Sequence, residues 1–426
     1  MDEKLLRYIW KYRLFEVREY FTTQEDVLEI VSCGTENNDS GPDFFDARIK
    51  INNTLWVGCV ELHLKSSDWM AHNHSQDEAY NNVVLHVVFE QDKAVFTSKG
   101  ELLPTFELKP LIDSSLIEKY RIYMESSHDI VCKNQFAAVD SFRLFAYLDR
   151  LLIERLEEKT VKIEEALTKQ VHNKEEVFYH TLAASFGFKI NALPFRLLAE
   201  SLPLKFLAKQ KDNLTQIEAM LFGQAGLLPV EKSDDYVELL KKEYNFLQRK
   251  FNLEPLCEAQ MWKFAKMYPQ GFPTLRIAQF AALIYRSSSL LSKILETKSA
   301  DELIQLFTVT ASDYWQSHYR FGVSAKKTNN RTLGKQAIIS LLINTVLPFI
   351  FAYSRWNNNE ELRNRVIDFY ENLELEINTI TRKYTALRPD FTTALHSQAL
   401  IQMYNKYCLH KQCLHCGIGL HLLKVK

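Results

Sequence analysis

The hydrophobic positions follow two different periods along the chain. Between Val27 and about Lys109, short segments are continuously apolar or alternate apolar with polar residues: VLEIVS, DARIKI, LWVGCVELHLK, NNVVLHVVFE, AVFTS and LLPTFELK. Turn sequences such as NNDSGPD and KG separate them, and this pattern predicts about five or six β-strands. From about Ser141 onward nearly every segment has helical periodicity, as in FRLFAYLDRLLIERLEEK. We therefore expect an α+β protein with a mixed sheet near its N-terminus and a large all-α domain after it.

The length of 426 residues is large for one hydrophobic core, so we expect more than one domain. The change of period places a β-rich α/β module at residues 1–135 and an all-helical domain at residues 136–404. Residues 405–426 are rich in cysteine and histidine, and we expect them to pack as a tail on the helical domain.

The longest apolar stretch is AIISLLINTVLPFIFAY, which starts at Ala337. Ser340, Asn344 and Pro348 interrupt it, and it is shorter than the roughly 20 residues of a membrane span. It predicts a buried helix with a proline kink and no membrane partner. The first residues, MDEKLLRYIWKYRLFEVREYF, lack the apolar core of a signal peptide, so we expect a cytoplasmic protein.

The net charge of −1 gives no overall field that would attract nucleic acid, so any phosphate-binding surface must be local. One basic region without acidic residues lies between Tyr314 and Asn359. Its loop-like part, HYRFGVSAKKTNNRTLGK, is either a solvated connector or a contact surface for a phosphate backbone. The candidate nucleic-acid contacts are Arg320, Lys326, Lys327 and Arg331.

Residues 58–77, GCVELHLKSSDWMAHNHSQD, concentrate potential chemistry. Side chains alternate across a strand, so Glu61, His63 and Lys65 share one face. Asp43 precedes an earlier strand, and a hairpin would bring it beside Glu61. Two converging carboxylates repel each other unless a cation lies between them, which predicts a divalent ion, Mg or Mn. The imidazole of His63 shifts this preference toward manganese or another transition metal.

Such an ion can position a phosphate and lower the pKa of a bound water, and Lys65 would stabilise the developing negative charge. We predict that Asp43, Glu61 and His63 are ligands of a catalytic ion. The predicted catalytic residues are these three together with Lys65. The imidazole of His86, inside an apolar strand, is either a hydrogen-bonded core group or a ligand. The predicted supporting residues are Asp68, His72, His74, Asp77 and His86.

The C-terminal segment YCLHKQCLHCGIG contains three of the seven cysteines in a C-x4-C-x2-C arrangement. A tetrahedral zinc needs only one further ligand there, and His410, His421 and His396 are the candidates. An iron–sulfur cluster completed by Cys132 or Cys257 and a metal-free group of reduced thiols are the alternatives. The predicted ligands of a structural zinc are Cys408, Cys413, Cys416 and His410.

Several long motifs resemble an uncharacterised bacterial family, the domain of unknown function 2851 family. In the first third they are GPDF (Gly41 to Phe44), VELH (Val60 to His63), DW (Asp68, Trp69), HNH (His72 to His74), Asp77, Tyr80 and NNVVLHVV (Asn81 to Val88). In the helical part they are FGFKINALPF, IEAMLFGQAGLLP, FPTLRIAQFA, INTVLPFIFAY, SQALIQMYNKYC and CLHCGIG. The resemblance covers nearly the whole chain and implies no particular activity.

Pro42, Asp43 and Glu61 are also similar in order and approximate spacing to the PD-(D/E)XK nuclease fold. In that fold an aspartate opens a hairpin, and a glutamate and a lysine follow on the next strand. Here His63 stands at the usual lysine position, and the lysine comes two residues later, at Lys65. This second resemblance implies a nuclease-like module that hydrolyses phosphodiester bonds.

The leading hypothesis is therefore a metal-dependent nuclease of the PD-(D/E)XK type, with the helical domain supplying contacts to nucleic acid. One alternative is a catalytically inactive protein of that fold that acts as a nucleic-acid-binding or protein-interaction module. Another is a transition-metal hydrolase of a small substrate.

Overall fold

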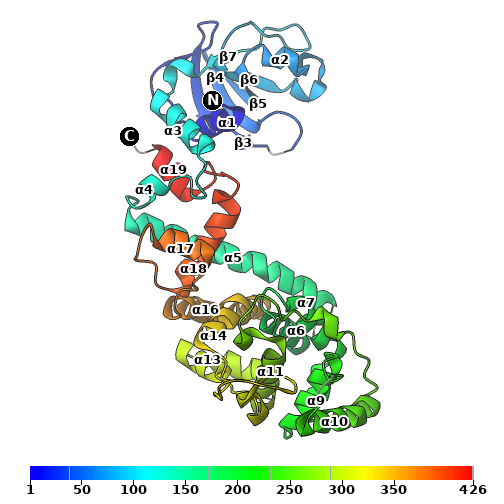
Figure 1. The fold of residues 1–426 in the computed structure, drawn as a ribbon. Coiled ribbons are helices and arrows are strands. Elements are labelled where there is room, and N and C mark those ends of the chain that lie inside the picture. Colours follow the sequence, from blue (N-terminus) through cyan, green and yellow to red (C-terminus); the bar gives the residue numbers. More distant parts are fainter. Residues whose placement is uncertain (38, 170–172, 231–232, 288, 425–426) are drawn as a thin grey trace. The chain divides into compact units, whose positions relative to one another are not determined.

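The computed structural model describes all residues except 38, 170–172, 231–232, 288 and 425–426. The chain forms two compact units (Figure 1). Unit 1 contains residues 1–144 together with 403–426, and unit 2 contains Phe145–Gln402. The α+β class predicted from the two periods is confirmed, because a mixed sheet occupies the first part of the chain and helices nearly all the rest.

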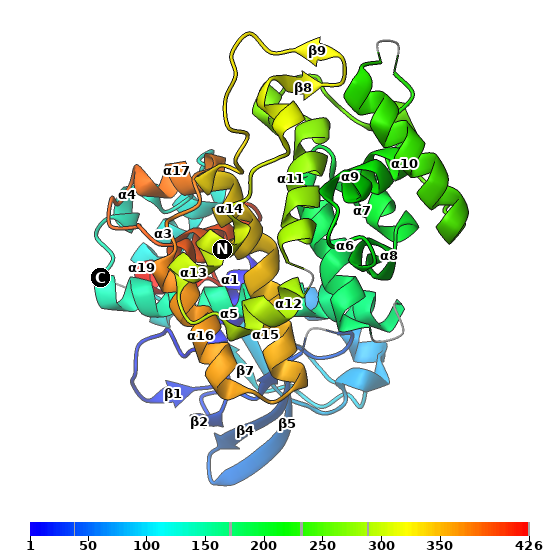
Figure 2. The same ribbon diagram turned by 90° about the horizontal axis from the view of Figure 1, so that it is seen from below.

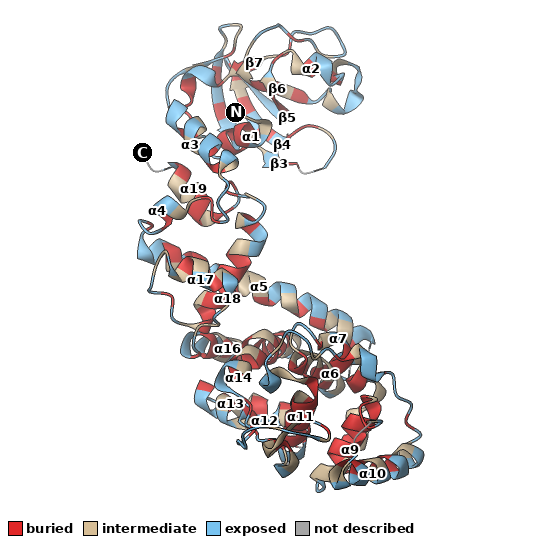
Figure 3. Cartoon of the chain, viewed as in Figure 1, coloured by how far each residue is buried: buried red, intermediate tan, exposed pale blue. Residues whose placement is uncertain are grey.

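The described residues of unit 2 form mainly helices, together with the short hairpin of β8 (His318–Arg320) and β9 (Val323–Ser324), which contacts α11 (Figure 2). α11 is buried on almost every side (Figure 3), which explains the apolar composition of FPTLRIAQFAALIY. The helices are α5 (Ser141–Lys169), α6 (Lys174–Phe186), α7 (Ala192–Ser201), α8 (Leu204–Ala208), α9 (Leu214–Gln224), α10 (Asp235–Phe251), α11 (Pro273–Arg286), α12 (Leu290–Glu296), α13 (Ala300–Phe307), α14 (Lys335–Leu341), α15 (Leu347–Trp356), α16 (Glu360–Asn372), α17 (Thr379–Thr385) and α18 (Ala394–Met403).

One helix, Lys335–Trp356, is long and apolar enough by length and composition to cross a membrane. In the structure, 78% of the most apolar 18-residue stretch of this helix is buried, so the predicted burial is confirmed. A π-helical turn, Leu342–Val346, separates α14 from α15 just before Pro348. Proline has no N–H to donate within a helix, and the wider turn accommodates this missing bond.

Unit 1 is built around a seven-stranded sheet with the order β1-β2-β4-β5-β6-β7, and β3 pairs with β4. The pairs from β1 to β5 are antiparallel, whereas β5, β6 and β7 run parallel. The strands are β1 (Tyr20–Phe21), β2 (Val27–Ser32), β3 (Thr35–Glu36), β4 (Phe44–Ile51), β5 (Thr54–Lys65), β6 (Val83–Glu90) and β7 (Thr105–Glu107). The predicted strand AVFTS is wrong, because only an isolated bridge from Phe96 to Leu102 forms there.

The connection from β5 to β6 contains α2 (Asp68–Ala71) and two 3₁₀ turns, η1 (His74–Gln76) and η2 (Glu78–Tyr80). A crossover of this kind is required because β5 and β6 are parallel. A Cβ atom at Gly58 would lie 2.5 Å from the Asn82 carbonyl oxygen, so glycine allows β6 to approach β5 where the crossover ends.

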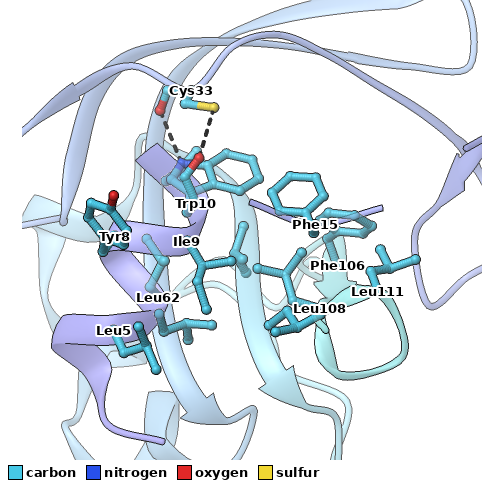
Figure 4. Packing of buried hydrophobic residues seen from close by; sticks show 14 of the residues in the cluster. Leu5, Tyr8, Ile9, Trp10, Phe15, Cys33, Leu62, Phe106, Leu108 and Leu111 are labelled. Carbon is cyan, nitrogen blue, oxygen red and sulfur yellow. Dashed lines mark hydrogen bonds between the residues drawn. The ribbon is translucent and has the colours of Figure 1, made fainter. Parts of the chain in front are cut away.

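α1 (Glu3–Lys11) covers one face of the sheet. The Asp2 side chain caps its first turn by accepting a hydrogen bond from Leu5 N. Leu5, Ile9 and Trp10 are fully buried against strand residues such as Leu62 (Figure 4). The Trp10 indole N–H donates to the Cys33 carbonyl, and the Cys33 thiol donates to the Trp10 carbonyl.

The opposite face of β5 carries a smaller cluster around Cys59 and Trp69. Val60, Leu62 and Leu64 therefore face α1, and the predicted alternation along VELHLK is confirmed.

The tail belongs to unit 1 and not to the helical unit on which the sequence placed it. α19 (Gly417–Lys424) contacts α3 (Ser114–Glu125), and α4 (Lys133–Phe136) follows shortly after α3. Leu414 and Leu423 join the same apolar cluster as α1. The chain thus leaves unit 1 at α5 and returns to it after α18.

The packing of α1 gives a first prediction. Leu5→Ala removes a fully buried side chain, and we expect it to lower the free energy of local unfolding of unit 1 by about 2–5 kcal/mol. Hydrogen exchange at the amides of β5, followed by mass spectrometry, measures this change. Leu55→Ala is the matched control, because Leu55 is 55% exposed. Equal protection in the two variants would contradict the packing described for α1.

Candidate functional site

Four histidines converge beside β5. His63 Nδ1 lies 2.9 Å from His86 Nε2 on β6, and His63 Nε2 lies 3.1 Å from His72 Nδ1, at the end of α2. His74, the first residue of η1, stacks on His63 with ring centroids 5.3 Å apart. One ligand atom from each of His63, His72 and His74 lies within 4.8 Å of the other two. This spacing matches side chains that bind one metal ion.

The crossover brings His72 and His74 to the strand. Asn73 between them has a φ of +60°, and this left-handed turn redirects the chain from α2 into η1. The Asp92 carboxylate fixes the start of the crossover by accepting hydrogen bonds from Ser66 Oγ, Ser67 N and Ser67 Oγ. The two loop histidines therefore come from a hydrogen-bonded turn, as sites on preorganised elements require.

Glu61 connects the histidines to the predicted acidic pair. Glu61 Oε1 lies 3.4 Å from His74 Nε2 and 3.7 Å from His63 Nε2. Glu61 Oε2 accepts a hydrogen bond from Asp43 N, and Asp43 Oδ2 accepts one from Leu62 N. The hairpin register, with Phe44 opposite Val60, places the two acids side by side. Arg7 of α1 forms an ion pair with Asp43 Oδ1.

Burial keeps the imidazoles of His63, His74 and His86 neutral. Burial lowers the pKa of His63 to about 2, with further contributions from the neighbouring His86, His74 and His72. Burial also lowers the pKa of His86 to about 3 and that of His74 below its ordinary value. A neutral imidazole offers a nitrogen lone pair, which is the form that binds a metal.

The carboxyl groups shift in the opposite direction. Burial raises the pKa of Glu61 well above its usual range, and the neighbouring Asp43 raises it further. Burial also raises the pKa of Asp43, although Arg7 and the Leu62 amide oppose this shift. Glu61 therefore retains a proton unless a cation compensates its charge.

Two buried nitrogen atoms of the cluster make no hydrogen bond among the described residues, His74 Nε2 and His86 Nδ1. Aromatic rings surround the histidines. Tyr80 stacks on His74 with ring centroids 3.8 Å apart, and Trp69 contacts His74 and His86 at 5.3 Å each. A buried polar atom without a partner is costly, and a bound cation would supply one to His74 Nε2.

The remaining predicted residues lie at the margin of the site. Lys65 is exposed at the end of β5, and its backbone N–H donates to the Asp68 carboxylate. Asp77 is exposed and caps η2 by accepting a hydrogen bond from Ala79 N. Sequence reasoning missed Arg7, whose proximity to Asp43 depends on how α1 packs. It listed Trp69 and Tyr80 only as parts of motifs.

The cysteines do not match the spacing predicted for a single ion. Among the described residues, His63, His72 and His74 form a group of potential ligands whose atoms all lie within 4.8 Å of one another. Cys408, Cys413 and Cys416 do not meet this distance. His410, predicted as their fourth partner, is exposed.

The predicted basic contacts lie in unit 2 and differ in exposure. Lys326 and Lys327 are exposed, and the Arg320 guanidinium lies over the rings of Phe264 and Phe272. Arg331 is buried and donates hydrogen bonds to the carbonyl groups of Trp315 and Lys327. Arg331 therefore stabilises the loop to which it belongs. Of the four predicted contacts, Arg320, Lys326 and Lys327 are the exposed ones.

Comparison with known proteins identifies a family but no characterised relative. No curated protein matches this chain, and no solved structure matches it, so the similarity to PD-(D/E)XK nucleases stays a prediction. The resemblance of the long motifs is confirmed, because a family model described as "Protein of unknown function (DUF2851)" matches residues 3–379. The chain therefore belongs to the DUF2851 family.

Proposed function

We propose that this protein is a metal-dependent hydrolase that cleaves phosphodiester bonds with an ion held by His63, His72 and His74. The observation that carries the proposal is the convergence of the three imidazoles within 4.8 Å, with a Glu61 oxygen 3.4 Å from His74 Nε2. Three histidines leave a coordination position open for water, as in catalytic metal sites. An ion held there would lower the pKa of a coordinated water toward neutral and so supply hydroxide for hydrolysis, in which one P–O ester bond breaks and the leaving alcohol takes up a proton.

The ligand chemistry favours a transition metal. Imidazole nitrogens suit zinc, iron, nickel and copper, whereas magnesium prefers oxygen ligands. Of the two ions expected from the acidic pair, manganese fits this donor set better than magnesium. Because burial lowers the pKa of His63 and His74, these two imidazoles can bind a divalent cation at physiological pH without first losing a proton.

The neighbouring groups have separate roles in this proposal. His86 hydrogen-bonds to His63 Nδ1 and so orients the ring, as outer partners of metal ligands do. Glu61 is close enough to act either as a fourth ligand or as the base for the attacking water. Lys65, at the exposed end of the same strand, would interact with the phosphate charge.

Two observations support a phosphodiester as the substrate. Asp43 and Glu61 meet across the β4–β5 hairpin, which is the arrangement implied by the similarity to PD-(D/E)XK nucleases. Arg320, Lys326 and Lys327 in unit 2 offer positive charge for a phosphate backbone. Nucleic acid is therefore the substrate class that we propose.

A non-catalytic binding protein is the second candidate, and one contact favours it. The Arg7 guanidinium is already paired with Asp43, so the carboxylate that would hold a metal in a nuclease of that fold has its charge compensated by the protein itself. If the histidine site serves structure only, the fold would act as a nucleic-acid-binding or protein-interaction module.

Metal binding tests the triad directly. His72→Ala removes a ligand that is exposed, so unit 1 should keep its fold while metal affinity falls by at least tenfold. Equilibrium dialysis of the chelator-treated chain against manganese or zinc, followed by elemental analysis, gives the affinity. His128→Ala, at an exposed histidine away from the triad, is the control. Unchanged binding in His72→Ala would rule out the triad as the metal site.

Replacing Glu61 tests the catalytic role. We expect Glu61→Gln to reduce the metal-dependent rate by about 10²–10⁴-fold, because the side chain keeps its size but loses its basic oxygen. The substrates are single- and double-stranded DNA, RNA and a small chromogenic phosphodiester, and Glu78→Gln at an exposed glutamate is the control. No turnover by the metal-loaded wild type would favour the binding module, and turnover of the small ester alone would favour a hydrolase of small substrates.

The raised pKa of Glu61 predicts how metal affinity depends on pH. A cation favours the deprotonated carboxylate, so binding releases the proton that burial retains on Glu61, and affinity should rise from weakly acidic to weakly alkaline pH. Protonation of His63 and His74 should add little in this range, since burial lowers the pKa of both. Calorimetric titration in buffers of different ionisation enthalpy counts the released protons. Wild type and Glu61→Gln should differ in slope, and identical slopes would contradict the assignment to Glu61.

A further inference from the structure

Four cysteines from two distant segments gather in unit 1. Cys132 is the residue before α4, and Cys408, Cys413 and Cys416 lie in the returning tail. Cys132 packs against the apolar cluster that contains Cys413. It is also close enough to interact electrostatically with each of the three tail cysteines. The spacing of cysteines within the tail does not predict that Cys132 lies near them.

The backbone of the tail holds its thiols in place. The segment turns at Lys411, which has a φ of +51° and whose ammonium group donates to the Met124 carbonyl. Cys416 N donates to the Cys413 carbonyl, so these two cysteines end one tight turn. A Cβ atom at Gly419 would lie 2.4 Å from the Cys413 carbonyl oxygen, so α19 packs tightly on this turn.

The environment of these thiols is unfavourable for negative charge unless a cation is present. Burial raises the pKa of Cys132, and the neighbouring Cys408, Cys416 and Cys413 raise it further. Burial and Cys416 also raise the pKa of Cys413 to about 12. Buried thiols that repel one another as thiolates become favourable ligands once a soft metal compensates the charge.

We propose that Cys132, Cys408, Cys413 and Cys416 bind a metal centre through four thiolates, with Cys132 as the fourth ligand instead of the predicted His410. Cys413 and Cys416 supply the chelating turn, and Cys132 supplies a ligand from the segment between α3 and α4. His410 is exposed, whereas Cys413 and Cys416 are buried and Cys132 and Cys408 are partly buried.

Two kinds of centre share this thiolate chemistry. A zinc–sulfur bond of about 2.3 Å places tetrahedral sulfurs about 3.8 Å apart, so zinc requires the described thiols to rotate inward. In a [4Fe–4S] cluster each thiolate binds a separate iron atom, which suits a wider spacing of the sulfurs. Either centre would tie the tail to α4 and close a loop from Cys132 to Cys408, which stabilises the folded chain by restricting the unfolded one.

The test is elemental analysis and absorption spectroscopy of the full-length His72→Ala variant, in which the histidine site is disabled, purified without oxygen. We expect about one metal centre per chain, and Cys132→Ser should lose it. Cys257→Ser should retain it, because that buried cysteine lies in unit 2 and donates to the Pro194 carbonyl. His410→Ala should also retain it. A visible charge-transfer band that bleaches on reduction identifies iron–sulfur, and zinc without such a band identifies the mononuclear site, so both support the proposal.

X-ray absorption at the metal edge keeps the test independent of how Cys132→Ser folds. The measurement uses His72→Ala, in which the histidine site is disabled, and the expected first shell contains sulfur only. A shell with one nitrogen, together with metal loss in His410→Ala, would restore His410 as the ligand and overturn the assignment. The assignment would also be overturned if fewer than about one chain in five carried metal and Cys132→Ser did not change this content. Neither result bears on the histidine site, so the two proposals fail separately.

Discussion

The structure of unit 1 depends on burying an acid and an imidazole on its central strand. β5 is flanked by β4 and β6, and from Cys59 to His63 both of its faces are covered. Transfer of an isolated carboxylate from water to such a place costs several kcal/mol. Backbone amides reduce this cost, because Asp43 N donates to Glu61 and Leu62 N donates to Asp43. The bend before β4 places the Asp43 amide beside Glu61, and it therefore lowers the cost of burying the Glu61 carboxyl group.

The sequence predicted those features of this arrangement that depend on neighbouring residues along the chain. Strand alternation placed Glu61 and His63 on one face, and hairpin connectivity placed Asp43 beside Glu61. The parallel register of β5 and β6, with Glu61 opposite His86, depends on the crossover and could not be derived from alternation. The left-handed turn at Asn73 likewise decides that His72 and His74 meet the strand.

Contacts between distant segments account for most of what the sequence did not predict. Arg7 lies on a helix whose polar face is equally suited to solvent, and only the packing of Leu5 and Ile9 fixes its position beside Asp43. The tail has helical periodicity like the rest of the C-terminal part, so periodicity assigned it to the helical domain. Its apolar residues pack in unit 1 instead, and this places it near Cys132.

Charge balance then separates the two possible metal sites around Glu61. An ion between Asp43 and Glu61 would compete with the Arg7 guanidinium for the buried Asp43 carboxylate. An ion among His63, His72 and His74 leaves the Arg7–Asp43 pair intact and meets three imidazole ligands and one carboxylate. The second arrangement compensates Glu61 without breaking any described contact of Asp43. The Arg7–Asp43 ion pair therefore favours a metal position among the histidines, next to Glu61 Oε1. The backbone amide of Asp43 orients Glu61 by donating to its other oxygen, Oε2.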